Sequence, residues 1–387
     1  MSRPPAAADR PLRVGIEAIP LLVVRTGVGT MTRAVVDRLA NDPGLEMSAI
    51  LISLRGRTRL AAALPPGMGL RAVPFPARLA HRLWLRGDHP ALGGFDVIHG
   101  PNFVVPPAAA DPLRLRGGRR RAVELLTIHD FGPWHYPGLV NDTARNYPRL
   151  VARALERGAH VHTVSAFVGS EAADILGVDR DRIHVIPNGF APGPAGDPTR
   201  GRGLAGGDPY VLAVGTIEPR KDLPTLVEAM ARLWAEGHDT RLVLAGPDGW
   251  GTPELDRAVA RTGAAHLVRR LGYVSDAERA DLLAGAACLA YPSRYEGFGL
   301  PPLEAMAQGT PVVATTIGAV TEVCADAALL VPPGDPDALA RALATVLSDD
   351  AEAARLVAAG RQRPPLFSWD RTAADLGALY RHLATTR

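Results

Sequence analysis

Two adjacent cations, Arg220 and Lys221, lie between a short apolar run and a helix-forming segment. The run Tyr210–Gly215 predicts a buried strand that ends in a glycine turn, and Asp222 is a favourable residue for the start of the following helix. Such a turn lies at the carboxyl edge of a parallel sheet, where ligands bind in α/β folds. A guanidinium beside an ammonium suits a diphosphate. The alternative is a solvated surface turn.

The lysine of this pair is unusual in the chain. Of the 43 basic residues, all but Lys221 are arginines. Lysine and arginine are not equivalent, because an ammonium is a compact charge on a flexible stem and a guanidinium is a planar fork. The position of the single lysine beside Arg220 therefore favours a functional role over chance survival.

A second segment brings two carboxylates close to a turn that can bind an anion. Glu296 follows the predicted strand Ala287–Tyr291, and Glu304 is expected in the first turn of the next helix. Two prolines at the helix start donate no N–H, so the free donors are those of Gly299 and Leu300. Carboxylates accept hydrogen bonds from hydroxyl groups, as sugars provide. Taken singly, Glu304 could instead pair with the helix dipole and Glu296 could be a surface residue.

His129 follows the predicted strand Glu124–Ile128 and is expected at the carboxyl edge of the first half's sheet. Asp130 could orient its ring or cap the next turn. The alternative for His129 is a buried histidine with satisfied hydrogen bonds.

Gly27 and Gly29 belong to a loop, Arg25–Thr30, that precedes a helix expected from about Thr32. Glycines at such a position let backbone amides approach an anionic ligand. The loop lacks the third glycine of the dinucleotide fingerprint, and a plain tight turn explains it equally well.

Other chemistries find little support. The histidines have no zinc-ligand spacing, and neither a Gly-x-Ser-x-Gly elbow nor a Walker loop is present. Aromatic residues are 5% and no nucleic-acid-binding module is recognisable, which argues against nucleic acid. Two basic segments, Ala77–Arg86 and Leu113–Arg121, are either solubilising surface or contacts with an anionic membrane or acceptor.

The 387 residues are enough for two domains, and the pattern supports that division. Short apolar runs alternate with helical segments, which predicts parallel sheets covered on both faces. The segment 191–209 is rich in glycine and proline without periodicity and is the expected linker. We expect two doubly wound α/β domains, 1–195 and 208–366, with a cleft between them, and a last helix within 367–387.

Neither a secretory signal nor an apolar run long enough to span a bilayer is apparent in the sequence. These features predict a cytoplasmic protein, with peripheral contact at the inner membrane face as an option through the basic segments.

The Arg220–Lys221 turn, together with Glu296 and Glu304 separated by seven residues, resembles the retaining family 4 glycosyltransferases of the GT-B fold, which have two Rossmann-like domains. The resemblance covers nearly the whole chain. Gly27-Val-Gly29 looks like the glycine loop of the family's first domain. The segments 163–165 and 185–189 look like the strands that end that domain.

The resemblance implies a role for each candidate residue. Arg220 and Lys221, after the Gly215 turn, would hold the donor diphosphate and stabilise it as a leaving group without a metal. Glu304 would bind the nucleotide ribose. Glu296, with the backbone of Phe298, Gly299 and Leu300, would bind the donor sugar and phosphate. His129 would contact the sugar near its anomeric centre, and the last helix would cross back onto the first domain.

The resemblance leaves several choices open. The donor could be GDP-mannose, as the segments 127–137 and 244–250 resemble those of mannosyl-transferring members, or a UDP-sugar. The acceptor could be a carbohydrate, a lipid-linked glycan or a small molecule. A nucleotide-sugar epimerase or a phosphorylase of the same fold would share the diphosphate cations, and a non-catalytic binding protein is a third reading.

Overall fold

The computed structural model describes residues 10–22, 27–109, 121–138, 142–207 and 209–386. Arg25, Thr26 and the basic segment as far as Arg120 lie outside these residues. The chain divides into two compact units, the first made of residues 1–189 and 369–387 and the second of residues 190–368. Each unit is described by itself. No helix among the described residues is long and apolar enough to cross a membrane.

Unit 1 is built on a parallel sheet in the order β3-β2-β1-β4-β5-β6-β7. β1 pairs with β2 on one side and with β4 on the other, so the strand order reverses between β1 and β4. Ligands bind at the carboxyl ends of the strands at such a reversal. The strands are β1 (Leu12–Glu17), β2 (Leu45–Ile52), β3 (Gly69–Val73), β4 (Val97–Gly100), β5 (Val123–Ile128), β6 (His160–Thr163) and β7 (Ile183–Val185).

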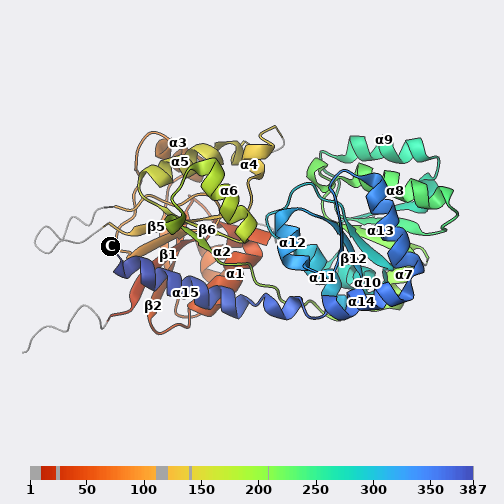
Figure 1. Ribbon diagram of the computed structural model, residues 1–387. Helices are drawn as coiled ribbons and strands as arrows, with labels where there is room; N and C mark the ends of the chain where they lie inside the picture. Colours follow the sequence, from red (N-terminus) through yellow and green to blue (C-terminus); the bar gives the residue numbers. More distant parts are fainter. Residues whose placement is uncertain (1–9, 23–26, 110–120, 139–141, 208, 387) are drawn as a thin grey trace, which may run out of the picture. The chain divides into compact units, whose positions relative to one another are not determined.

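Helices cover both faces of this sheet (Figure 1). One face carries α3 (Ala77–Trp84), α5 (Tyr147–Glu156) and α6 (Ala166–Leu176), and the other carries α1 (Gly27–Leu39) and α15 (Trp369–Thr385). Smaller helices are α2 (Arg57–Ala63) and α4 (Gly132–His135). Side chains of β1, α1 and α15, among them Ile16, Val35 and Leu376, form one buried apolar cluster. The last helix of the chain is therefore part of the first unit's core.

A buried chain of hydrogen bonds fastens α15 to this sheet. His162 Nε2 donates to the Ile186 carbonyl at 2.9 Å, so its Nδ1 is an acceptor and receives the hydroxyl proton of Thr127 at 2.9 Å. Thr127 must then accept from His99 Nε2, at 2.7 Å, which leaves His99 Nδ1 to accept from the Tyr380 hydroxyl at 2.7 Å. Every donor has an acceptor only if both imidazoles are neutral.

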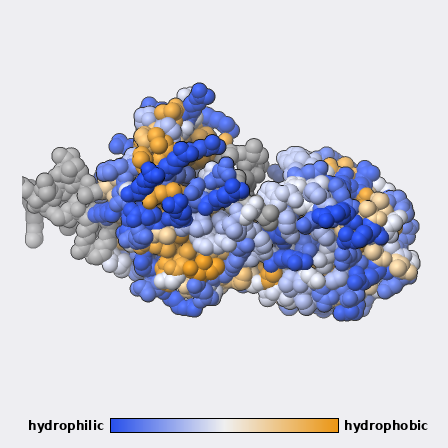
Figure 2. Space-filling view, turned by 90° about the horizontal axis from the view of Figure 1, so that it is seen from above, coloured by the Kyte–Doolittle hydropathy of each residue, from blue (hydrophilic) through white to orange (hydrophobic). Residues whose placement is uncertain are grey.

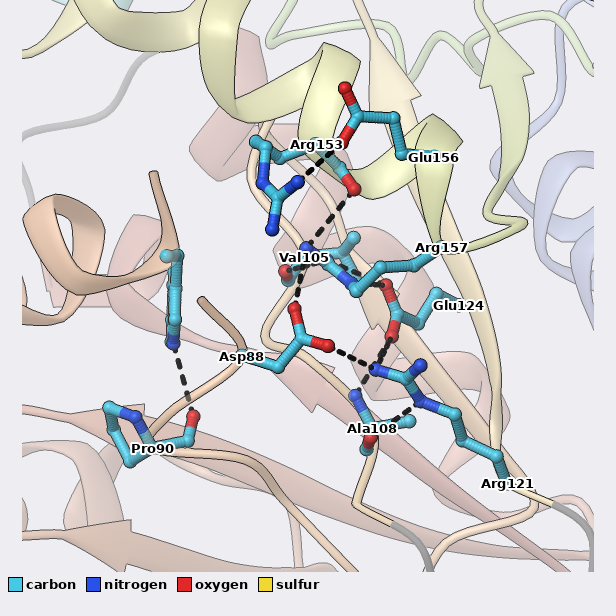
Figure 3. Close-up of polar contacts among 10 residues, drawn as sticks. Asp88, Pro90, Val105, Ala108, Arg121, Glu124, Arg153, Glu156 and Arg157 are labelled. Carbon is cyan, nitrogen blue, oxygen red and sulfur yellow. Dashed lines mark hydrogen bonds and ion pairs between the residues drawn. The ribbon is translucent and has the colours of Figure 1, made fainter. Parts of the chain in front are cut away.

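A buried ion pair joins Arg157, at the end of α5, to Glu124, near the start of β5 (Figure 3). Arg157 Nη2 lies 2.7 Å from Glu124 Oε2, and the backbone N–H of Ala108 donates to Glu124 Oε1 at 2.9 Å. Arg121 Nε donates to the Ala108 carbonyl at 2.7 Å. In the same region the indole of Trp84 donates to the Pro90 carbonyl at 3.1 Å. Arg157 thus ties the end of α5 to the sheet, and Trp84 ties the end of α3 to the loop that precedes β4.

Unit 2 repeats the doubly wound plan with the strand order β10-β9-β8-β11-β12-β13, and here the reversal falls between β8 and β11. Its strands are β8 (Tyr210–Val214), β9 (Arg241–Ala245), β10 (Val268–Gly272), β11 (Cys288–Tyr291), β12 (Val312–Thr315) and β13 (Leu329–Val331). One face carries α8 (Leu223–Ala235), α9 (Thr252–Thr262) and α13 (Pro336–Ser348). The other carries α7 (Pro198–Ala205), α10 (Asp276–Gly285) and α11 (Leu300–Gln308), and the remaining helices are α12 (Gly318–Cys324) and α14 (Asp350–Gly360).

Two sequence predictions about elements were wrong, and one strand was not predicted. The expected linker contains α7, which begins after Asp197, whose carboxylate accepts the N–H of Thr199 at 2.8 Å. The helix expected from Thr32 begins at Gly27, so both glycines of the loop are helical. The edge strand β3 was missed because it is short and only half buried, and so lacks an apolar run.

The neutral histidine pair predicts an acid-sensitive first unit. Burial lowers the pKa of His162 to about 4, and burial with the neighbouring His162 lowers that of His99 as well. Unfolded histidine takes up a proton below a pH of about 6.5, so the unfolded state binds more protons than the fold between pH 6.5 and 4. The free energy of unfolding should fall across that window by about 3 kcal/mol for His162 alone.

Urea unfolding at several pH values checks this expectation. His162→Gln should be less stable than the wild type at pH 7.5 but should show a shallower loss towards pH 4. His238→Gln, in unit 2, serves as the control and should keep the wild-type slope. An unchanged slope in His162→Gln would contradict the assignment.

Candidate active site

The turn after β8 brings two cations to the point where the strand order of unit 2 reverses. Gly215 follows β8 with a φ of 135°, a conformation that side chains disfavour, and a Cβ there would lie 3.3 Å from Lys221 Cε. The chain then forms a short 3₁₀ helix, Pro219–Lys221, before α8 begins. Glycine is needed at this turn both for the backbone and for the space that the lysine stem occupies.

The carboxylate of Glu296 lies between these cations. Its Oε1 is 2.5 Å from Lys221 Nζ, and its Oε2 is 2.7 Å from Arg220 Nη1. The hydroxyl of Ser293 also donates to Oε1, at 2.9 Å. Lys221 Nζ donates a further hydrogen bond to the Tyr291 hydroxyl at 3.1 Å and lies 4.7 Å from the centre of its ring. The first carboxylate of the sequence motif thus meets both predicted cations.

Electrostatics keep this cluster ionised although it is buried. Burial disfavours the carboxylate, but Lys221 and Arg220 hold the pKa of Glu296 down at about 2. Burial lowers the pKa of Lys221, and Glu296 opposes that shift. Glu218 also pairs with Arg220, at 2.8 Å. A buried ammonium and a half-buried guanidinium are therefore already aimed at an anion, and a diphosphate could take the place of their carboxylate partners.

Two turns far apart in sequence are joined at this site. The N–H of Arg294, after β11, donates to the Arg220 carbonyl at 2.7 Å, and its Nε donates to Asp222 Oδ2 at 2.7 Å. Asp222 is the residue that precedes α8, as expected for a helix cap. Its side chain, however, makes no capping hydrogen bond. Its carboxylate binds Arg294 instead, and this fixes the positions of the two turns.

Glu304 lies in the second turn of α11 and not in its first, because the helix begins at Leu300. Its carboxylate pairs with Arg279 Nε of α10 at 3.1 Å, and burial raises its pKa while Arg279 opposes the rise. Gly299 precedes the helix with a φ of 120°. The side chain of Phe298 is buried and packs edge-on against Phe367, at 5.5 Å between centroids.

His129 belongs to unit 1, at the end of β5. Its Nε2 donates to the Pro101 carbonyl at 2.8 Å, so Nδ1 carries the lone pair, and burial lowers its pKa. Asp130 caps the next turn by accepting the Gly132 N–H at 2.8 Å. Gly27 and Gly29, also in unit 1, lie in the first turn of α1.

Sequence reasoning missed several side chains at these edges. Ser293 and Tyr291 bind the charged cluster, and only the spacing of three residues between Ser293 and Glu296 could have indicated it. Two exposed aromatic side chains, Trp250 and Tyr273, follow β9 and β10 at the same edge of the sheet. Within the described residues, no three histidine, cysteine or acidic side chains come together as a metal site.

Two Rossmann-like units of this kind define the GT-B fold. A sucrose-phosphate synthase from Thermosynechococcus elongatus has the same fold, with a TM-score of 0.71 over 98% of this chain and 100% of that one at 24% identity. Residues 199–363 match the family description "Glycosyl transferases group 1", and residues 25–192 match "Glycosyltransferase Family 4".

The chain belongs to the family 4, group 1 glycosyltransferases, and it is therefore a glycosyltransferase enzyme. The O-antigen chain mannosyltransferase B of Escherichia coli is 32% identical over 71% of this chain and 71% of its own length. A D-inositol 3-phosphate glycosyltransferase of Kribbella flavida is 30% identical over 100% of this chain and 99% of its own length.

The charged cluster yields a prediction about stability. Glu296→Gln leaves the buried Lys221 and the half-buried Arg220 beside each other without the shared carboxylate, so the free energy of unfolding should fall by about 3 kcal/mol. Pyrophosphate should recover more of that loss in the variant than it adds to the wild type, because it replaces the missing charge. Urea unfolding with and without pyrophosphate measures both effects.

The exposed substitution Glu236→Gln is the matched control for this experiment and should leave stability within about 0.5 kcal/mol of the wild type. If Glu296→Gln behaved like this control, the ion pairs would have no energetic role.

Proposed function

We propose that this chain is a retaining glycosyltransferase that moves a hexose, mannose, from GDP-mannose to a hydroxyl group of a glycan, glycolipid or small-molecule acceptor. The observation that carries the proposal is the pair of cations at the strand reversal of unit 2, a buried lysine and a half-buried arginine, each held against Glu296. The names of the two relatives support a sugar transfer, and that of the first supports mannose.

The chemistry follows from where charge develops. Departure of a nucleoside diphosphate builds negative charge on its phosphate oxygens, and fixed cations aimed at those oxygens lower the barrier. Arg220 offers a planar fork and Lys221 a point charge, so together they can bind both phosphates. Once the diphosphate engages these cations, the Glu296 carboxylate becomes available to accept hydrogen bonds from sugar hydroxyls.

The other candidate residues have supporting roles in this proposal. Glu304 binds the ribose through a carboxylate that its pairing with Arg279 keeps oriented. The backbone of Phe298, Gly299 and Leu300, at the start of α11, receives the donor phosphate and sugar. His129 contacts the sugar near the anomeric carbon. Retention arises by attack on the same face as the departing phosphate.

Lys221→Arg tests the proposed role of the single lysine. The Nζ occupies a buried position between Glu296 and Tyr291, where a planar fork is too large, so charge is kept but geometry is lost. Turnover should fall by roughly tenfold or more, which corresponds to about 1.4 kcal/mol or more in the barrier. The exposed Arg257→Lys provides the converse exchange as a control. Wild-type kinetics in Lys221→Arg would remove the lysine from the mechanism.

The donor is tested by competition. Transfer from GDP-mannose should exceed transfer from UDP-glucose, and GDP should inhibit more strongly than UDP in the same assay, because a base pocket matched to one base leaves polar groups unpaired with another. If UDP inhibits roughly ten times more tightly than GDP, the GDP-mannose assignment is wrong, while the transferase assignment stands.

We further propose that α3 rests on an anionic membrane face. Arg78, Arg82 and Arg86 are exposed, and beside them Leu79 and Leu83 are 43% and 39% exposed. Figure 2, which views the molecule from above, shows hydrophobic and hydrophilic surface alternating over unit 1. Trp84, in the same helix, does not join this face, since its side chain is 3% exposed and points inward.

Vesicle binding tests this surface. Replacing the three arginines of α3 and its end by glutamine should weaken binding to anionic vesicles roughly 100-fold, since each basic residue near such a surface contributes about 1 kcal/mol. Replacing them by lysine keeps the charge and should keep most of the binding. Flotation of the wild type that does not depend on salt, or does not occur, would reject the proposal.

A further inference from the structure

Unit 1 has a strand reversal of its own, and one carboxyl group at that point has no role in the function proposed so far. Glu17 is the last residue of β1, and the order of the sheet reverses between β1 and β4. In unit 2 the corresponding reversal holds Lys221 and Glu296. The crevice outside the carboxyl ends at a reversal is the usual ligand position in such sheets. Glu17 therefore occupies the equivalent position in unit 1.

Polar side chains from two other segments gather near Glu17. Asn102, two residues beyond β4, donates a hydrogen bond to the hydroxyl of Tyr147, the first residue of α5. β1 and β4 are adjacent, with Ile16 paired to His99, so Glu17 and Asn102 lie at the same edge of the sheet. Besides burial, the charge of Glu17 raises the pKa of the Tyr147 phenol. A carboxylate, an amide and a phenol thus come together from β1, the loop after β4 and the start of α5.

Aromatic side chains border this polar set. Phe103 stacks on Tyr147 with ring centroids 4.9 Å apart and planes at 16°, and it lies 6.5 Å from the ring of His129. Phe103 has a φ of 59°, which is rare for a bulky residue. Such strained positions gather at ligand sites, where the surrounding structure holds them. Phe103 directly follows Asn102 in the chain, and its ring contacts those of Tyr147 and His129. The polar set and the candidate residue His129 therefore lie in one region of unit 1.

The chemistry of the set suits hydroxyl groups. A carboxylate accepts two hydroxyl hydrogen bonds, and an amide and a phenol can both donate and accept. Burial raises the pKa of Glu17 to about 7, although the N–H of Ile19 donates to its Oε1 at 2.8 Å. Carboxyl groups perturbed in this way concentrate at functional sites. A negative carboxylate would repel a phosphate at the same place.

We propose that Glu17, Asn102 and Tyr147 bind the acceptor, and that the part of the acceptor held here is a neutral polyol, a sugar or a cyclitol, whose hydroxyl donates a hydrogen bond to Glu17. This inference rests on the proposed transferase function and adds to it the residues and the chemical class of the acceptor site. Glu17 here binds substrate and takes no part in holding the donor.

The experiment uses the full chain and follows labelled hexose from GDP-mannose and from UDP-glucose to methyl α-mannopyranoside, to myo-inositol and to water. Glu17→Gln should raise the KM for the polyol that the wild type uses by roughly tenfold or more, because one of the two oxygens that can accept the hydroxyl is replaced by an NH2 donor. Hydrolysis of the donor and the KM for the donor should stay within about twofold of the wild type, since unit 2 is untouched.

Two further variants keep the test sharp. Tyr147→Phe removes only a hydroxyl and should raise the same acceptor KM if Glu17→Gln folds poorly. Glu46→Gln makes the same exchange at an exposed position on β2 and should change nothing.

Each remaining outcome identifies which proposal fails. An unchanged acceptor KM in both site variants overturns the acceptor site. Donor hydrolysis by a wild type that transfers to neither polyol overturns the polyol class. A wild type that turns over neither nucleotide sugar under any condition contradicts the proposed function itself.

Discussion

The interaction on which unit 2 depends is the pairing of one buried carboxylate with two cations. Burial by itself raises the pKa of Glu296 and lowers that of Lys221, so it disfavours the charged form of each. Together the groups keep each other ionised in a place from which water is largely excluded. The Gly215 turn, the hydrogen bonds between the two loops and the reversal of strand order all serve to bring these side chains to one point. The positive charges that a phosphate group would need are thus already in place in the fold, paired with Glu296.

The same sheet plan supports different chemistry in the two units. Both reverse their strand order once, and in each a carboxylate lies at the carboxyl edge beside the reversal. In unit 2 that carboxylate is compensated by cations and stays ionised, whereas burial moves Glu17 towards neutrality. An anionic substrate fits the first environment and an uncharged one fits the second. Neighbouring side chains, more than the fold, decide which substrate each edge can take.

Much of this architecture was predictable from sequence, because buried parallel strands are nearly continuous apolar runs. Tyr210–Val214 and Val123–Ile128 could be predicted in this way, and with them the edge positions of Lys221 and His129. β3 could not, since half of an edge strand faces solvent. The short helix α7 was hidden by its glycines and prolines, which are breakers in isolation but are tolerated where the helix packs against α10. Partners such as Arg294 for Asp222 depend on the meeting of two distant turns, which no local pattern encodes.

Unit 2 is formed by a single stretch of the chain, whereas unit 1 is formed by two. Unit 2 is one continuous segment, 190–368, while unit 1 is closed by the two ends of the chain, with α15 in its core. The first and last residues of unit 2 lie side by side, because the N–H of Phe190 donates to the Phe367 carbonyl at 2.9 Å. In topological terms unit 2 is an insert whose ends are adjacent. Such an arrangement permits domain exchange: a homologous second unit with another nucleotide specificity could be substituted at these adjacent ends without rerouting the chain that builds the first.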